Sequence, residues 1–519
     1  MLKRVLPFLV ASLALRLVFW FATFPNPDEA YYWLWGEHPA FSYYDHPPFH
    51  AWIQGIFTAV LGRSFWVLRL PNLLSNTAFF YCYYQISKHL YGKWANDYFW
   101  MMTALILASP LYFLFLGLAW HDHWLITFCL SSAYLFIRFL DSYITNQKGE
   151  TLLLYSSAGL LGFAFLCKYS AVFVGAGFIA TVVSIPALRS LLRDRRFYIA
   201  ILITLSAFLP VLLWNFGNDF QSFRYYANRS VDVGSFQLKW AEPLNFLLFS
   251  VLMVSPINVW AMVKTIRQPS PQIRSDTVYR TVALWIFGIS TVSLSAIALF
   301  STALYYWNIT AYLLLFPLLP PIFLKPPASH TPHSTLHTPH STLRTSKLFT
   351  AGQFYGLLFA GLLVVHYSVI PLSAFADPSG DPDSQMLFGW DAVGRAVQIQ
   401  QQELGESFLV TTDYRSASAL AYQLDDPTVI AISDRRDQFD IWYKPDQLKG
   451  KNALILADDW HPADPKLLAQ FERTSEPIVV LVNRFGRSLK TYYVIKGYGF
   501  QGARTNDEFK TLLFRNASD

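Results

Sequence analysis

Acid and base side chains gather in one short stretch near the N-terminus, residues 25–50, which read PNPDEAYYWLWGEHPAFSYYDHPPFH. The stretch holds four carboxylic acids, three histidines and eight aromatic rings. The adjacent acids Asp28 and Glu29 precede the aromatic run YYWLW, which would keep water from a carboxylate and raise its pKa. Such a carboxylate is suited to general-base catalysis. The same two acids also fit the first turn of a helix, so a structural role stays open.

The end of this stretch carries a second polar group, Tyr44-Asp45-His46, followed by two prolines. The prolines favour an extended approach and the start of a new helix. An acid beside an imidazole would position a phosphate or a metal ion, and a capping turn is the alternative.

A further acid is flanked by two histidines, His121-Asp122-His123, between two apolar segments. Ionisable groups there are unfavourable unless they face water or a functional site. These three residues, with Asp28, are candidate metal ligands. Neighbouring side chains of an extended chain point apart, which weakens that interpretation, and a solvated hairpin fits equally well.

Basic and amide groups beside apolar segments suggest how an anion would be held. Lys168, in the sequence LCKYSA, would pair with an anionic lipid head group or extend its ammonium to the membrane surface. Asn215 and Arg224 lie in the aromatic and basic segment WNFGNDFQSFRYYANR. That segment suits a sugar-phosphate lipid or an aromatic belt at the membrane interface.

The composition indicates an integral membrane protein. Of 519 residues, 53% are hydrophobic and 14% charged, and the mean hydropathy is +0.29. Soluble domains carry about 25% charged residues. The net charge of +6 favours cytoplasmic anchoring over nucleic-acid binding. The three cysteines lie in apolar segments and are expected to be buried thiols without disulfides.

A spanning helix needs about 20 mostly apolar residues. We predict about eleven spans, at 5–24, 66–87, 98–118, 123–140, 151–167, 170–189, 197–214, 243–263, 279–300, 304–324 and 349–372. The first lacks a small-residue cleavage site and is interpreted as a retained helix rather than a signal peptide. The shorter segment 49–62 is predicted to be an interfacial helix.

The distribution of Lys and Arg predicts the orientation. The N-terminus and alternate loops are basic and are placed in the cytoplasm, including a loop at 325–347 with the repeat TPHSTLH/TPHSTLR. That repeat is interpreted as a duplicated linker rather than a metal site. The first loop, 25–65, and the C-terminal residues then face outward.

Residues 373–519 differ from the rest of the chain, which we predict to be a transmembrane catalytic domain over 1–372. Short apolar runs (FLVTT, PTVIAIS, NALILAD, PIVVLVN, KTYYVIKGY) alternate with possible helices near 416–423 and 463–471. This pattern predicts a small soluble α/β domain. It carries no GxGxxG or Walker signature for a nucleotide.

Taken together, PDEAYYWLW, YYDHPP, AWHDHW, KYSA and the tail motifs GWDAVG, YRSASALAYQL and RRDQFDIW resemble one family. This is the bacterial ArnT-like, protein-mannosyltransferase-like glycosyltransferases (glycosyltransferase family 39 type) of the GT-C fold. The resemblance covers nearly the whole chain, but its motifs specify no sugar.

The resemblance implies a multi-pass enzyme of the bacterial inner membrane with its C-terminal domain in the periplasm. It implies transfer of a sugar, with inversion, from a polyprenyl-phosphate carrier to lipid A, a glycan, a glycolipid or a protein. Asp28, Glu29 and Asp122 match the family's catalytic acids. By analogy Lys168, and with less support His46 or Arg224, would hold the carrier phosphate. A divalent metal ion at Asp122 stays open, because two histidines replace the commoner pattern there.

Two other classes of function remain. A transporter or flippase of a lipid-linked sugar would show charges in mid-membrane and repeated halves, whereas here the polar groups cluster in outer loops. A non-catalytic assembly subunit would not need these acidic motifs. Within the glycosyltransferase interpretation, the enzyme would alternatively polymerise or ligate glycans instead of adding one sugar.

Overall fold

The computed structural model describes residues 1–146, 148–230, 238–268, 274–325, 344–375, 381–433, 435–443 and 445–502. The repeat TPHSTLH/TPHSTLR lies outside these residues apart from its last residue, Arg344. The contacts divide the chain into two units. The helical unit comprises Met1–Leu17, His46–His50 and Arg69–Gly361, and the mixed unit comprises Val18–Asp45, Ala51–Leu68 and Leu362–Asp519.

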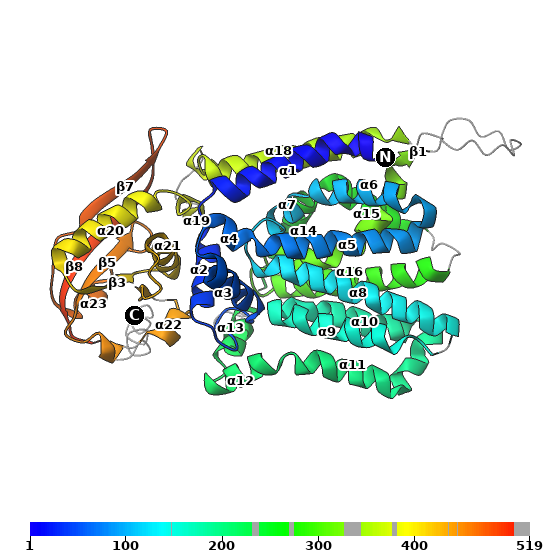
Figure 1. Ribbon diagram of the computed structural model, residues 1–519, viewed down its shortest axis with the longest axis horizontal. Coiled ribbons are helices and arrows are strands. Elements are labelled where there is room, and N and C mark those ends of the chain that lie inside the picture. The colour runs from blue at the N-terminus through cyan, green and yellow to red at the C-terminus, as the bar shows by residue number, and fades with distance from the viewer. Residues whose placement is uncertain are drawn as a thin grey trace, which may run out of the picture. The chain divides into compact units, whose positions relative to one another are not determined.

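The helical unit is built from long apolar helices joined by short turns (Figure 1). The α-helices that lie wholly or mostly in it are α1 (Leu2–Ala22), α5 (Pro71–Tyr91), α6 (Ala95–Leu107), α7 (Pro110–Phe115), α8 (His121–Asn146), α9 (Thr151–Cys167), α10 (Val172–Ser184), α11 (Arg195–Ser206), α12 (Leu209–Gly217), α13 (Gln221–Ser230), α14 (Ala241–Val254), α15 (Pro256–Arg267), α16 (Arg274–Ala298), α17 (Pro320–Phe323) and α18 (Lys347–Ser368). Short 3₁₀ helices include η3 (Pro186–Arg193) and η4 (Tyr305–Tyr312), and β1 (Leu324–Lys325) pairs with β2 (Arg344–Thr345).

Four helices of the described chain are long and apolar enough to cross a membrane: Leu2–Ala22, His121–Asn146, Thr277–Ala298 and Lys347–Ser368. Four further pairs qualify if each is taken as one bent span, which brings the number to eight. Proline explains two of the sharpest bends, because Pro186 and Pro256 begin the second helix of pairs bent by 113° and 102°. All eleven predicted ranges contain helix, and the count of eleven spans stays a prediction.

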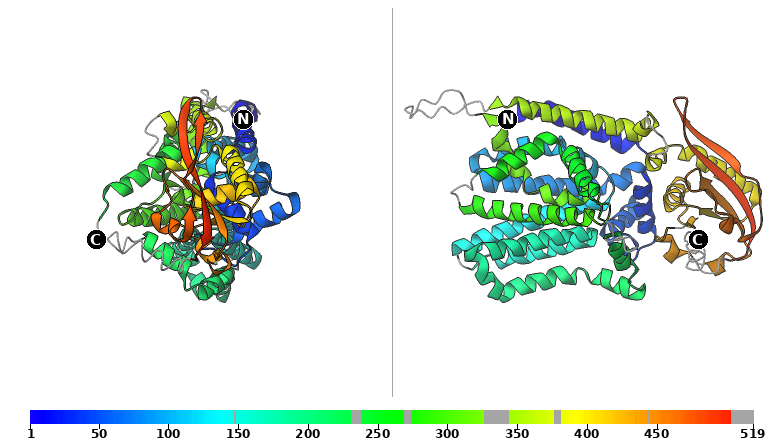
Figure 2. Two further views of the ribbon diagram at one scale, coloured as in Figure 1. Left: turned by 90° about the vertical axis from the view of Figure 1, so that its left-hand side faces the viewer. Right: turned by 180° about the vertical axis from the view of Figure 1, so that it is seen from behind.

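Helix α8 lies at the centre of the helical unit and packs against α5 and α9. Helix α9 in turn packs against α11, and α10 against α16, so these helices lie side by side, as Figure 2 also shows from behind. The three cysteines are buried free thiols, as their apolar surroundings predict.

The mixed unit contains a six-stranded sheet. The order is β4-β3-β5-β8-β6, and β7 also pairs with β8. The parallel strands are β3 (Ser407–Thr411), β4 (Ile430–Ala431) and β5 (Asn452–Asp458); the antiparallel ones are β6 (Phe471–Thr474), β7 (Ile478–Arg484) and β8 (Arg487–Phe500). The five apolar runs of the sequence overlap β3, β4, β5, β7 and β8. The helix expected at 463–471 is only one turn, α23 (Pro465–Leu468), before β6 begins.

Helices of the first loop belong to the mixed unit rather than to the helical one. The helices of this loop are α2 (Pro27–Glu37), most of α3 (Phe49–Leu61) and α4 (Phe65–Arg69). The C-terminal helices of the same unit are α19 (Pro382–Gln385), α20 (Trp390–Leu404), α21 (Tyr414–Leu424) and α22 (Phe439–Trp442). This grouping differs from the predicted boundary at 372/373, because α2 packs on α21. Helices α2 and α3 meet at two glycines: a Cβ on Gly55 would lie 2.6 Å from the carbonyl oxygen of Gly36.

A buried ionic network stabilises the carboxyl end of β5. Asp458 accepts hydrogen bonds from His461 and pairs with Lys490 at 3.2 Å, and both charged side chains are almost fully buried. Burial alone would raise the pKa of Asp458, but its hydrogen bond to His461 and the charge of Lys490 lower it overall. Burial alone would lower the pKa of His461, but Asp458 and Asp413 raise it overall.

Candidate functional site

The first turn of α2 is what positions Asp28. Asn26 caps the helix, with its side-chain oxygen 2.9 Å from the Glu29 amide, and the Glu29 carboxylate accepts a hydrogen bond from the Asn26 amide at 3.1 Å. Pro27 adds a fixed φ at the first helical position. Glu29 is thus buried in a capping box, while Asp28 as a whole residue is half-buried.

The pKa of Asp28 is raised to about 6. Burial is the largest cause, and the nearby carboxylate of Asp383 adds to it. The guanidinium groups of Arg435 and Arg415 act in the opposite direction, and Asp45 has a smaller raising effect. A carboxylate with this pKa is ionised at neutral pH and still basic enough to accept a proton.

Aromatic rings from the first loop and from the C-terminal residues pack together near Asp28. The Tyr31 ring lies 5.0 Å from the Tyr414 ring and stacks on Phe439 at 5.9 Å. The charge of Asp28 raises the pKa of Tyr414, so the two side chains are close enough to interact electrostatically. Gln438 ties the segments together, because its amide donates to the Tyr31 hydroxyl at 3.0 Å and its side chain accepts from the Tyr44 amide at 2.8 Å.

Asp45 pairs with Arg435 at 3.1 Å, and the Arg435 guanidinium lies 4.1 Å from the centre of the Tyr414 ring. Arg415 donates to Asp413 at 2.8 Å and also pairs with Asp383. None of these C-terminal residues was predicted to have a role in the site. Arg435 lies in RRDQFDIW, one of the tail motifs that carry the family resemblance. That motif pointed to the family but did not indicate what Arg435 does.

A second group of polar residues lies within the helical unit. Asp122 stands in the first turn of α8, and Lys168 directly follows α9. The Lys168 ammonium donates to both Asp122 carboxylate oxygens, at 3.0 and 3.2 Å, and lies 4.9 Å from the centre of the Tyr306 ring. Because α8 and α9 are adjacent and antiparallel, they bring together two predicted residues that are 46 positions apart.

Four histidines surround this ion pair. The His121 ring lies 4.4 Å from that of His46 and 5.1 Å from that of His50, and His50 lies 5.5 Å from His123. Three of them have a further partner: the Tyr226 hydroxyl lies 2.9 Å from His46 Nδ1, His123 Nδ1 lies 2.7 Å from the Ser75 hydroxyl, and His50 Nε2 lies 2.7 Å from the Ala119 carbonyl oxygen. His50 was not among the predicted site residues, although it closes the stretch 25–50.

Two predicted residues do not join these groups. Asn215 is fully buried, and its side chain donates to the Val211 carbonyl in its own helix. Arg224 is exposed on α13, whereas Tyr226, two positions further along, contacts His46. Their proposed role in binding the substrate therefore has no support from contacts in the described residues.

Some of the candidate metal ligands already contact other side chains. Both oxygens of Asp122 already contact the Lys168 ammonium, and a metal ion would have to displace that cation. Ser75 contacts His123 Nδ1. Over the described ranges, no three His, Cys, Asp or Glu side chains are grouped as metal ligands. A divalent metal ion at Asp122 stays a prediction.

Comparison with known proteins gives matches in family and in fold. Residues 45–214 match the dolichyl-phosphate-mannose-protein mannosyltransferase family. The lipid A galacturonosyltransferase RgtD of Rhizobium johnstonii is 26% identical over 295 residues, which are 55% of this chain and 58% of that protein. The chain therefore spans less than two thirds of this relative.

The fold is similar to that of ArnT from Cupriavidus metallidurans. Its structure bound to undecaprenyl phosphate matches with a TM-score of 0.58 at 15% identity, over 95% of this chain and 98% of ArnT. The structure without ligand gives a TM-score of 0.53 at 14% identity with the same coverage.

Proposed function

From its place among the ArnT-like, protein-mannosyltransferase-like proteins of the GT-C fold, we propose that this chain is a membrane glycosyltransferase. It transfers a sugar from a polyprenyl-phosphate carrier to an envelope lipid on the periplasmic side. The observation that carries this proposal is Asp28, a partly buried carboxylate in an aromatic surround whose pKa of about 6 suits a general base.

The donor and acceptor classes follow from the relatives. ArnT has a solved complex with undecaprenyl phosphate, and the matched family is described by a dolichyl-phosphate sugar. Both carriers are polyprenyl phosphates. RgtD is a lipid A galacturonosyltransferase, which favours a lipid acceptor over a protein or a free glycan. The N-terminus would lie in the cytoplasm, as the distribution of Lys and Arg predicts.

In the proposed reaction, Asp28 accepts the proton of an acceptor hydroxyl. The acceptor oxygen attacks the anomeric carbon of the sugar, and the bond from that carbon to the carrier phosphate oxygen breaks. The carrier leaves as polyprenyl phosphate with the bonding electron pair, and the sugar inverts its configuration. Within the helical unit, the Lys168 ammonium, which Asp122 orients through its two contacts, is a cation suited to a phosphate group.

The first test is deletion of the gene followed by mass spectrometry of envelope lipids, glycans and glycoproteins. Loss of one sugar from a lipid would support the proposal and identify donor and acceptor. Complementation by Asp28→Asn should restore the protein to the membrane but not the sugar. If Asp28→Asn restores the sugar fully, Asp28 is not the base, and a transporter without transfer chemistry becomes the better explanation.

A further inference from the structure

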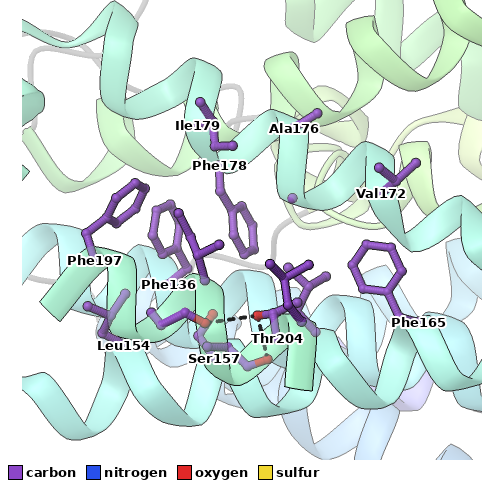
Figure 3. A pocket seen from close by; sticks show the side chains of 16 residues that line it. Phe136, Leu154, Ser157, Phe165, Val172, Ala176, Phe178, Ile179, Phe197 and Thr204 are labelled. Atoms are coloured by element: carbon purple, nitrogen blue, oxygen red, sulfur yellow. Dashed lines mark hydrogen bonds between the residues drawn. The ribbon is translucent and has the colours of Figure 1, made fainter. Parts of the chain in front are cut away.

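The helical unit contains an apolar cavity of about 270 Å³ between α9, α10 and α11, closed on one side by Phe136 of α8 (Figure 3). Its walls include Leu154 and Phe165 of α9, Phe178 of α10 and Phe197 of α11. The glycosyl-transfer mechanism makes no use of this cavity.

The polar atoms in the wall are already paired. The Ser157 hydroxyl donates to the Ser132 carbonyl at 2.8 Å, and the Thr204 hydroxyl donates to the Ala158 carbonyl at 3.0 Å. Water needs two to four polar partners to occupy a buried cavity. The cavity therefore favours an apolar occupant.

The mouth of the cavity opens among exposed apolar side chains. Val172, Ile179 and Leu205 line it and are 48%, 48% and 58% exposed. On a helix that crosses a membrane, such side chains face lipid hydrocarbon. The molecules at this mouth are therefore lipid chains.

Arginines gather at one end of the cavity. Arg189, Arg193 and Arg195 are exposed in η3 and at the start of α11, immediately before Phe197. Arg196 donates to Thr151 at 3.1 Å, so the starts of α9 and α11 lie at this same end. From Leu154 to Phe165 the cavity wall extends roughly 16 Å away from these arginines, at the helical rise of about 1.5 Å per residue.

We propose that this cavity is a binding site for an anionic phospholipid. One acyl chain occupies the apolar cavity, and the phosphate contacts Arg193 and Arg195. Basic clusters beside helices on the cytoplasmic side are suited to such head groups. The polyprenyl carrier is not the occupant, because Lys168 follows the opposite end of α9, roughly 25 Å from Thr151.

The experiment is native mass spectrometry of the full chain in mild detergent, titrated with palmitoyl-oleoyl phosphatidylglycerol or the phosphatidylcholine with the same chains. The phosphatidylglycerol should bind at least tenfold more tightly. Gly175 lines the cavity, and a Cβ there would only just touch Leu161, so Gly175→Leu should fill the space and abolish binding of both lipids. The control is Gly159→Leu, because a Cβ on Gly159 meets nothing within 4 Å.

A charge variant tests the head-group contact. Removing Arg193 and Arg195 as Arg193→Gln/Arg195→Gln should weaken phosphatidylglycerol binding roughly 30-fold, about fivefold for each arginine. Binding of phosphatidylcholine, whose choline cation offsets its phosphate, should weaken less. The control Lys264→Gln/Arg267→Gln removes the same charge from the exposed end of α15 and should change neither.

Three results would overturn the proposal. The first is equal binding of the two phospholipids by the unmodified chain. The second is full phosphatidylglycerol binding by folded Gly175→Leu, or by Ala176→Leu if Gly175→Leu fails to elute as a single species. The third is a loss of undecaprenyl-phosphate binding, rather than phospholipid binding, in those variants.

Discussion

The pKa of Asp28 gives a prediction that separates a catalytic base from a structural acid. If the pKa is about 6, about 9% of Asp28 is ionised at pH 5 and about 91% at pH 7. The kcat/KM for sugar transfer should then fall roughly tenfold from pH 7 to pH 5, since this ratio reports ionisation of the free enzyme. With the ordinary value of 3.8, the fall would be only about 6%.

A titrating phosphate on the substrate would give a similar profile, so variants near Asp28 are needed. Asp383→Asn removes a carboxylate that raises the pKa of Asp28, and should move the acidic limb to lower pH. Arg435→Gln removes a cation that lowers this pKa and also releases Asp45, and should move the limb to higher pH. A substrate group would not follow either change.

The assay measures transfer from the polyprenyl-phosphate sugar identified by the deletion experiment, with purified enzyme, at pH 5–8. Asp391→Asn is the control, because that carboxylate is exposed, pairs with Arg395 and does not influence Asp28. Asp28→Asn should lower kcat/KM by about 10²–10⁴-fold at pH 7. A profile that is flat from pH 5 to 7, or two limbs that move in the same direction, would refute the role of Asp28 as the titrating base.

Three further predictions concern stability and packing. Lys168→Met leaves the buried Asp122 unpaired and should destabilise the protein by about 3–5 kcal/mol in a detergent denaturation assay. Adding Asp122→Asn to that variant should restore most of the lost stability, and additive effects of the two substitutions would contradict the pairing. Gly55→Ala places a Cβ 2.6 Å from the Gly36 carbonyl oxygen and should cost about 1–3 kcal/mol despite better helix propensity, so an unchanged melting temperature would argue against this contact. Protonated His461 stabilises the mixed unit below about pH 6.5, and this contribution is lost as the pH rises through the raised pKa of His461. Pulse proteolysis of the full chain should therefore show greater stability at pH 6 than at pH 8, and His461→Gln should reduce that difference.

The sequence was informative where chemistry depends on local neighbours. The acids beside YYWLW indicated a desolvated carboxylate, and Asp28 has the raised pKa that this predicts. The structural alternative, that both acids lie in the first turn of a helix, is also confirmed: Asn26 caps that helix and Glu29 completes a capping box. The resemblance to ArnT-like proteins of the GT-C fold, drawn from scattered motifs, is confirmed by the family and fold matches.

Partners distant in sequence could not be predicted in the same way. Arg435 lies 390 residues from Asp45, and no local pattern pairs them. On α13, Arg224 and Tyr226 are two positions apart and so point to different sides of the helix. Charge favoured Arg224, but the rotation of the helix brings Tyr226 to His46.

The segment Tyr44-Asp45-His46 illustrates why adjacency in sequence is a poor guide to shared function here. Asp45 is bound by Arg435 in the mixed unit, whereas His46 is bound by Tyr226 in the helical unit. The sequence suggested that the acid and the imidazole together hold a phosphate or a metal ion. Their separate partners make them independent mutational targets: changes at Asp45 act on the surroundings of Asp28, and changes at His46 act on the histidines around Asp122 and Lys168.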